Sequence, residues 1–228
     1  VKEIDYNEEG AYLRDLFSGG FSFQREGEKM QFTSSTGVQY LADRMQMDQD
    51  YTPDSIFFLK QKQNIQSLTQ EFVFRSNNEK KYQWVAGLFG FYKDLKINSP
   101  MEFRSGAMDM LQGYMDAAKI ANPAMPTITI LNESMSIPGQ FNNLAYGLAV
   151  YHESTYNITK KLSFTAGVRL DYEKTNIDYE TSATLNTRIK VSPSPFAPLI
   201  YADSTYCVSG TQSNEFWQVL PKAAIKYD

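Results

Sequence analysis

The sequence predicts an all-β fold, namely an antiparallel up-and-down transmembrane β-barrel segment with about seven long strands. Apolar and polar residues alternate without a break over 162–172. Globular strands usually have about five or six residues, whereas a membrane-spanning strand needs about 9 to 11. Fifteen Tyr and fifteen Phe against two Trp give a composition typical of strands. The connections between the predicted strands also alternate between short and long.

Seven extended segments account for the predicted strands. In the first, Phe17, Phe21 and Phe23 share one face. A polar turn follows at 25–29 and predicts a hairpin. The other six segments are expected at 30–49, in a run ending at 75, and at 82–96, 144–156, 162–175 and 216–227.

The predicted connections fall into two groups. Three are polar turns of about five residues, at 25–29, 77–81 and 157–161. The other three are mostly much longer, near 48–56, 98–142 and 176–214. Outer-membrane barrels have short periplasmic turns and long extracellular loops, and a soluble sandwich has no reason to separate the two. We therefore expect 98–142 and 176–214 to be long extracellular loops.

One of these loops contains a helical pattern. Met108, Leu111, Met115 and Ala118 recur at helical spacing, before Asn122 and a proline. This spacing places all four on one side of a helix. The sequence thus predicts one loop helix near 102–120.

Composition and charge exclude several classes of protein. The net charge is −4 and the pI about 5.2, which argues against a nucleic-acid partner because phosphates require clustered Lys and Arg. The longest apolar run, 84–91, is too short for a membrane-spanning helix. The single Cys207 forms no internal disulfide. The sequence opens on Val1 without the pattern of a leader, as expected if export is absent or if the start lies elsewhere, and we interpret the chain as a fragment.

Several stretches together resemble the TonB-dependent receptors of Gram-negative outer membranes. They are FTSSTGVQYLADRMQMDQDYTP (32–53), SLTQEFVFRS (67–76), WVAGLFGFYKD (84–94), LAYGLAVYHESTYNITKKLSFTAGVRLDYEK (144–174) and LPKAAIKYD (220–228). One departure stands out, because the family usually has Arg two residues after Glu71 and this chain has Val73. Arg75 lies two residues further along the same face.

The resemblance implies active import of a scarce nutrient, often a ferric siderophore or similar metal complex, through a barrel of about 22 strands. Residues 1–228 would be a partial barrel domain, about a third of a receptor, without the plug and the C-terminal strands. The implied partners are outer-membrane lipid, the TonB complex acting through the missing N-terminal region, the receptor's own plug and a small-molecule substrate. The implied location is the cell outer membrane, and no enzymatic activity is expected.

The single histidine does not predict a catalytic site. His152 lies on the same face as the apolar residues of its strand. Glu153 points to the opposite face and cannot orient the His152 ring. We interpret His152 as a structural residue at the membrane interface.

The methionines, aspartates and glycines that could form a binding site also have structural interpretations. Six of the nine methionines lie in 98–142, where packing of a loop helix explains them better than copper capture. Asp48, Asp50 and Asp54 lack the Gly and Glu of a calcium loop. Gly87, Gly90, Gly147 and Gly167 lie within strands and are expected at close-packing positions. No catalytic residue, cofactor or metal ligand is predicted, and the ligand-binding residues stay unassigned.

Charged residues on the predicted lumen face are Glu71, Arg75, Arg169 and Asp171. They either contact a plug, line a solute route, or form solvated ion pairs. Two other classes of protein stay open at this point. One is a soluble β-sandwich that binds carbohydrate or protein. The other is a passive outer-membrane porin or a barrel enzyme.

Overall fold

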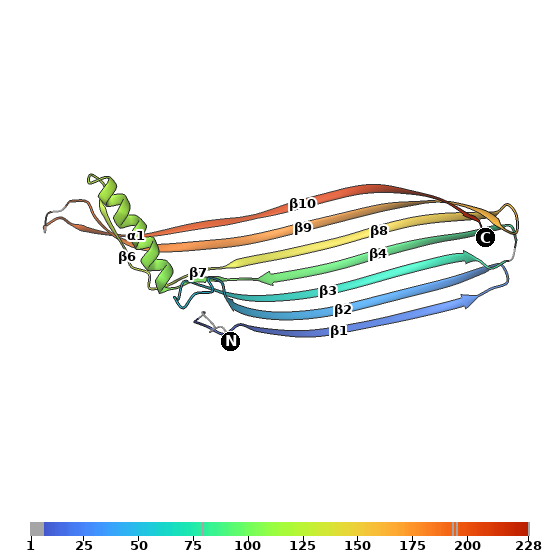
Figure 1. Cartoon of the computed structure of the whole chain (residues 1–228), viewed down its shortest axis with the longest axis horizontal. Coiled ribbons are helices and arrows are strands. Elements are labelled where there is room, and N and C mark those ends of the chain that lie inside the picture. Colours follow the sequence, from blue (N-terminus) through green and yellow to red (C-terminus); the bar gives the residue numbers. More distant parts are fainter. Residues whose placement is uncertain (1–6, 79, 193, 195, 228) are drawn as a thin grey trace.

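The computed structural model describes residues 7–78, 80–192, 194 and 196–227. Seven long strands form one sheet, in which every neighbouring pair is antiparallel and follows chain order (Figure 1). They are β1 (Ala11–Glu26), β2 (Met30–Asp48), β3 (Phe57–Ser76), β4 (Tyr82–Asn98), β8 (Gly139–Asn157), β9 (Leu162–Lys190) and β10 (Leu199–Tyr227). β1 and β10 form the two edges of this sheet. The prediction of an up-and-down arrangement of seven long strands is confirmed.

The three short turns lie together at one end of the sheet, which we call the turn end (Figure 1). The Gly27 N–H donates to the Met30 carbonyl at 2.9 Å and closes the β1–β2 turn. In the β8–β9 turn, the Thr159 hydroxyl accepts hydrogen bonds from the N–H groups of Lys161 and Leu162. The predicted turn at 77–81 includes Glu79, which lies outside the described residues.

The remaining connections lie at the opposite end, the loop end. The longest of them, between β4 and β8, contains β5 (Met101–Phe103), α1 (Ser105–Ala121), β6 (Thr127–Ile130) and β7 (Met135–Ile137). The predicted loop helix is thus confirmed. Met108 is buried, and Leu111, Met115 and Ala118 on the same side of α1 are half-buried. Among the described residues, no helix has the length and apolar character needed to cross a membrane.

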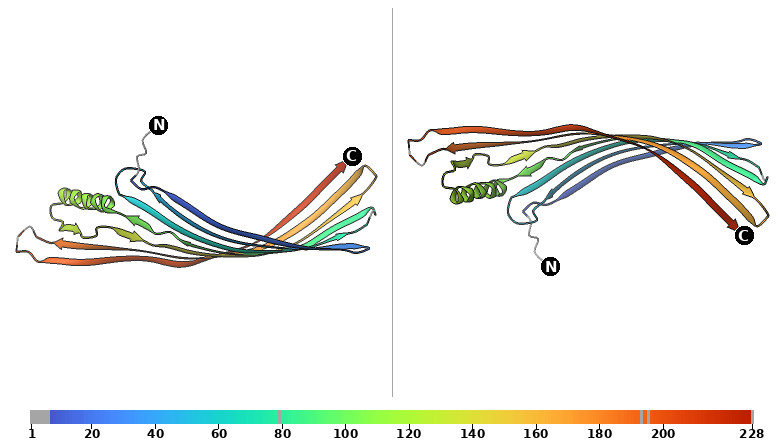
Figure 2. Two further views of the ribbon diagram at one scale, coloured as in Figure 1. Left: turned by 90° about the horizontal axis from the view of Figure 1, so that it is seen from below. Right: turned by 90° about the horizontal axis from the view of Figure 1, so that it is seen from above.

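Strand β6 extends the sheet at the loop end. It pairs with β9 from Thr127↔Lys190 to Ile130↔Thr187, where β8 has already ended. The Gln112 side chain of α1 accepts the Ile130 N–H at 2.8 Å and donates to the Ile128 carbonyl at 3.1 Å. Figure 2 shows that the sheet is strongly twisted and that α1 lies over one side of it.

The expectation of a loop at 176–214 is wrong. Strands β9 and β10 stay paired through this whole stretch, from Tyr227↔Leu162 to Leu199↔Lys190, and only 191–198 connect them. Each strand has 29 residues, which is roughly 95 Å at a rise of about 3.3 Å per residue. The apolar alternation ends near 175, but backbone pairing and β-branched residues such as Thr181 and Val208 continue the hairpin.

Candidate functional site

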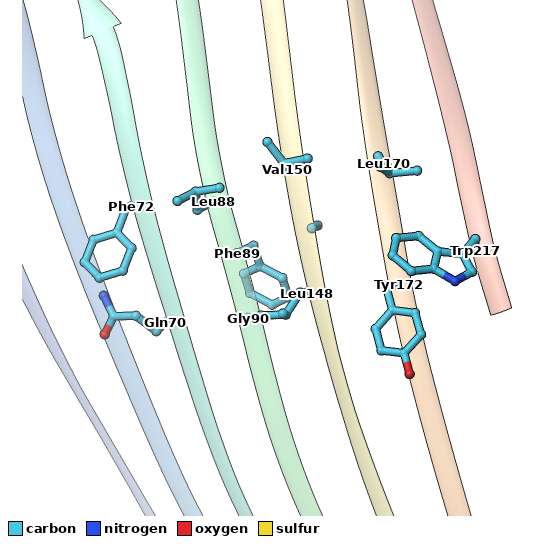
Figure 3. Close-up of a pocket in the computed structure, with 11 residues that line it drawn as sticks. Gln70, Phe72, Leu88, Phe89, Gly90, Leu148, Val150, Leu170, Tyr172 and Trp217 are labelled. Carbon is cyan, nitrogen blue, oxygen red and sulfur yellow. The ribbon is translucent and has the colours of Figure 1, made fainter. Parts of the chain in front are cut away.

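One face of the sheet, which we call the outer face, carries exposed apolar side chains. Leu88, Val150, Leu170 and Val219 lie directly opposite one another on four neighbouring strands. Leu88 is 51% exposed, Val150 47% and Val219 62%. Leu88, Val150 and Leu170 line a shallow apolar hollow together with Phe72, and these four side chains lie side by side in Figure 3. An uncovered apolar area of this kind marks a surface that contacts another protein or lipid.

Two lines of aromatic residues bound this apolar area on the outer face. The upper girdle, toward the loop end, consists of Tyr40, Tyr92, Tyr146, Tyr172 and Trp217. The lower girdle, toward the turn end, consists of Phe32, Tyr82, Tyr156, Phe164 and Tyr227. On each strand the two girdles lie eight to ten residues apart. On strands tilted by about 40° this is roughly 20 to 25 Å, which matches the apolar band of about 25 Å in outer-membrane barrels.

The upper girdle crosses the strands obliquely. Trp217 lies opposite Tyr172, and Tyr92 lies opposite Tyr146. However, Tyr172 lies opposite Leu148, so the girdle shifts by two residues between β9 and β8. A horizontal belt on tilted strands must shift in this way, because directly opposite residues lie at different heights. The aromatic pattern therefore indicates strands that are tilted relative to the band.

The opposite face, which we call the inner face, carries a polar network. The Tyr151 hydroxyl donates to Glu71 at 2.9 Å, and Arg169 forms an ion pair with Asp171 at 2.8 Å. The Arg169 guanidinium also lies 5.8 Å from the centre of the Phe89 ring. The structure thus brings three of the four predicted lumen residues close to one another.

The fourth predicted lumen residue, Arg75, lies nearer the turn end, opposite Val85. On the same face, Lys222 of β10 pairs with Glu153 of β8 at 2.5 Å, across Gly167 of β9. The inner face therefore presents charges of both signs.

Sequence reasoning did not single out Tyr151. Its ring lies across Gly87, where an added Cβ atom would be 2.2 Å from the Tyr151 Cζ atom. A Cβ on Gly147 would similarly be 2.5 Å from the Phe91 ring. The prediction of close-packing glycines is confirmed at both positions. The pairing of Gly87 with Tyr151 depends on cross-strand register, which alternation alone does not give.

His152 lies on the outer face near the lower girdle. Its ring stacks on Trp84 with 6.4 Å between ring centres, and its Nε2 atom is 2.9 Å from the Ser154 hydroxyl oxygen. Glu153 lies on the inner face with Lys222. The prediction that His152 and Glu153 point to opposite faces is confirmed.

Asp50 organises the loop between β2 and β3. Its carboxylate accepts hydrogen bonds from the Thr52 hydroxyl at 2.6 Å and from the N–H groups of Thr52, Ile56 and Phe57. Partial burial raises the pKa of this carboxyl, but the hydrogen bonds outweigh burial and lower the pKa to about 2. No group of three His, Cys, Asp or Glu residues within the described ranges is arranged to hold a metal ion.

The family comparison extends over nearly the whole chain. The sequence model described as TonB dependent receptor-like, beta-barrel matches residues 3–228. No curated protein has a significant sequence match.

The fold resembles that of a receptor of known structure. The ferric yersiniabactin uptake receptor FyuA from Yersinia pestis superposes with a TM-score of 0.54 at 15% identity, over 88% of this chain and 25% of that one. The CymD monoaromatic hydrocarbon channel gives a TM-score of only 0.20 at 7% identity, over 96% of this chain and 87% of that one, which is too low to indicate a shared fold. The chain spans about a quarter of the length of FyuA, and that likeness concerns the fold. The chain belongs to the TonB-dependent receptor-like β-barrel family.

Proposed function

We propose that this chain forms part of the barrel wall of an outer-membrane transporter that imports a scarce nutrient with energy supplied through TonB. The observation that carries the proposal is a sheet with an aromatic-bounded apolar band on one face and a charged network on the other, within this receptor family. Only the lipid-facing side of a barrel wall requires such a band. A ferric siderophore or similar metal complex is the proposed cargo, since FyuA is a ferric yersiniabactin uptake receptor.

The proposed orientation follows from the two ends of the sheet. Short turns face the periplasm in such barrels and longer connections face the outside. The β9–β10 hairpin and the segment containing α1 would therefore project from the cell, where incoming cargo first meets the protein.

The inner face is proposed to contact the plug or line the solute route. Arg169 lies near Asp171, Glu71 and the Phe89 ring, so its positive charge offsets two carboxylates. Reversal to a carboxylate would leave like charges facing the lumen. We expect Arg169→Glu in the full-length protein to lower cargo uptake while the amount inserted in the membrane stays unchanged. Arg169→Lys is the matched control and should retain most uptake.

Cell fractionation and uptake test the function together. The protein carrying this sequence should be found in outer membranes of its source cells, and its deletion should abolish uptake of at least one radiolabelled ferric siderophore. Loss of TonB should abolish that uptake as well. Transport that survives without TonB would support a passive porin instead. A soluble protein, found outside the membrane fraction, would overturn the proposal and favour the sandwich.

A further inference from the structure

The β9–β10 hairpin extends beyond the neighbouring strands at the loop end (Figure 1). Strand β8 leaves β9 at Gly139↔Thr181, whereas β9 and β10 stay paired up to Leu199↔Lys190. Because this pairing has no interruption, odd-numbered residues of β9 and even-numbered residues of β10 lie on the inner face throughout. In the proposed orientation, this part of the inner face borders the route by which cargo enters.

Charged side chains are confined to one face of the hairpin beyond the upper girdle. In the described stretches 175–189 and 200–214, the outer face carries Asp178, Glu180, Arg188 and Asp203. The inner face of the same two stretches carries no charged side chain. Nearer the turn end, by contrast, the network around Arg169 places charges of both signs on the inner face. The uncharged wall is therefore a property of the part of the hairpin that lies outside the apolar band.

Apolar and aromatic side chains form a patch on this wall, which we call the hairpin patch. It consists of Phe141, Ile177, Tyr179, Tyr206 and Val208. Phe141 lies opposite Tyr179, and Tyr179 lies opposite Gly210, where an added Cβ would be 2.8 Å from the Tyr179 hydroxyl oxygen. Tyr206 is 73% exposed and Phe141 41%. Exposed apolar surface that gathers in one place marks a site of contact with another molecule.

We propose that the hairpin patch contacts an uncharged metal complex with apolar groups and discriminates against anionic complexes. An anionic complex would lose hydration beside this wall without gaining a cation, whereas an uncharged complex gains from the burial of apolar surface. The hydroxyl groups of Thr181 and Tyr206 supply hydrogen bonds for its polar atoms. Glu173, on the inner face next to the wall, adds a repulsion for anions. This inference rests on the transport function proposed above and adds the charge class of the cargo.

The test uses the full-length protein purified in detergent and two iron complexes of nearly identical shape. Both are ferric desferrioxamine B acylated at its amine, one with a succinyl group that ends in a carboxylate and one with the corresponding carboxamide, which leaves the complex uncharged. We expect the carboxamide complex to bind roughly tenfold more tightly, because the carboxylate loses hydration without gaining a partner. Quenching of the intrinsic fluorescence of the protein measures both affinities.

Two lysine variants locate the effect. Tyr206→Lys places a cation in the hairpin patch and should remove or reverse the preference for the uncharged complex. Thr205→Lys is the matched control, because it places the same charge at the same height on the outer face of β10. This control should keep the preference of the parent protein.

Several results would overturn the proposal. Equal or tighter binding of the carboxylate complex by the parent protein would contradict selection by charge. The same change of preference in both lysine variants would place the effect outside the patch. Binding of neither complex, or a lower unfolding midpoint of Tyr206→Lys without a change of preference, would show that other parts of the receptor cover the patch. TonB-dependent uptake that persists in any of these cases leaves the transport proposal standing.

Discussion

At the residue scale, one contact between strands requires a glycine, because the side chain of one strand fills the space that a Cβ atom of the other would need. Tyr151 reaches Glu71 across Gly87, so the hydrogen bond depends on the missing Cβ atom. A half-buried tyrosine hydroxyl needs a hydrogen-bond partner, and the Tyr151 hydroxyl bonds to Glu71 two strands away. The inner face therefore combines charge pairs with an aromatic ring that occupies the space beside a glycine.

The substitution Gly87→Ala tests this contact. The added methyl group would collide with the Tyr151 ring, and overpacking of this kind costs about 1 to 3 kcal/mol. We expect a lower midpoint in urea unfolding of the full-length protein, followed by tryptophan fluorescence. Gly113→Ala in α1 is the matched control, because nothing lies within 4 Å of its added Cβ. It should be neutral or stabilising, and an equal loss in both variants would contradict the role of Gly87.

The substitution Val168→Arg tests the assignment of the outer face. Val168 lies within the band and is 48% exposed, so a charge there would face lipid and cost about 2 to 4 kcal/mol near the midplane. We expect less folded protein in outer membranes, measured by heat-modifiable migration. Ser182→Arg lies on the same face of β9 but beyond the upper girdle, and should insert normally. Normal insertion of Val168→Arg would mean that the outer and inner faces are assigned the wrong way round.

At the element scale, connections are held by polar side chains. The loop between β2 and β3 has few apolar residues to bury, and the Asp50 carboxylate instead accepts four hydrogen bonds, from Thr52 and Ile56 of the loop and from Phe57 at the start of β3. Such bonds to an ionised carboxylate are stronger than neutral ones. The order of this loop therefore depends on one negative charge.

Acid should loosen the loop in a defined range of pH. The folded pKa of Asp50 is lowered to about 2, and the unfolded value is about 3.9. The contribution of Asp50 to stability is therefore complete above about pH 4 and is lost as the pH falls through about 2. We expect hydrogen exchange at 50–57, corrected for its intrinsic dependence on pH, to increase over that range. Asp50→Asn should show faster exchange at neutral pH, whereas Asp54→Asn, whose backbone N–H rather than carboxylate bonds to Thr52, should not.

At the scale of the whole molecule, the sheet has two ends and two long edges with different roles. The edges at β1 and β10 present unpaired backbone groups, which cannot stay unpaired in lipid. In the proposed membrane location, further strands of a barrel would therefore have to cover them. The connections at the two ends differ in length and composition, and this difference sets the proposed orientation.

Epitope tags test that orientation. A tag inserted in the connection at 191–198 should bind antibody on intact cells, because β9 and β10 carry it far beyond the upper girdle. A tag in the turn at 158–161 should bind only after the outer membrane is permeabilised. The reverse pattern would invert the orientation, and the amount of folded protein in each strain serves as the control.

The sequence by itself determined the strand order, the short turns, the loop helix and which residues share each face of a strand. Alternation, turn residues and helical spacing are local properties, and each belongs to one segment of chain. Only the tertiary structure decided that 176–214 is a hairpin, because outside the lipid band neither face must be apolar and the alternation disappears while pairing continues. It likewise decided the contact of Tyr151 with Gly87 and the alignment of Tyr179 with Gly210, because both depend on cross-strand register.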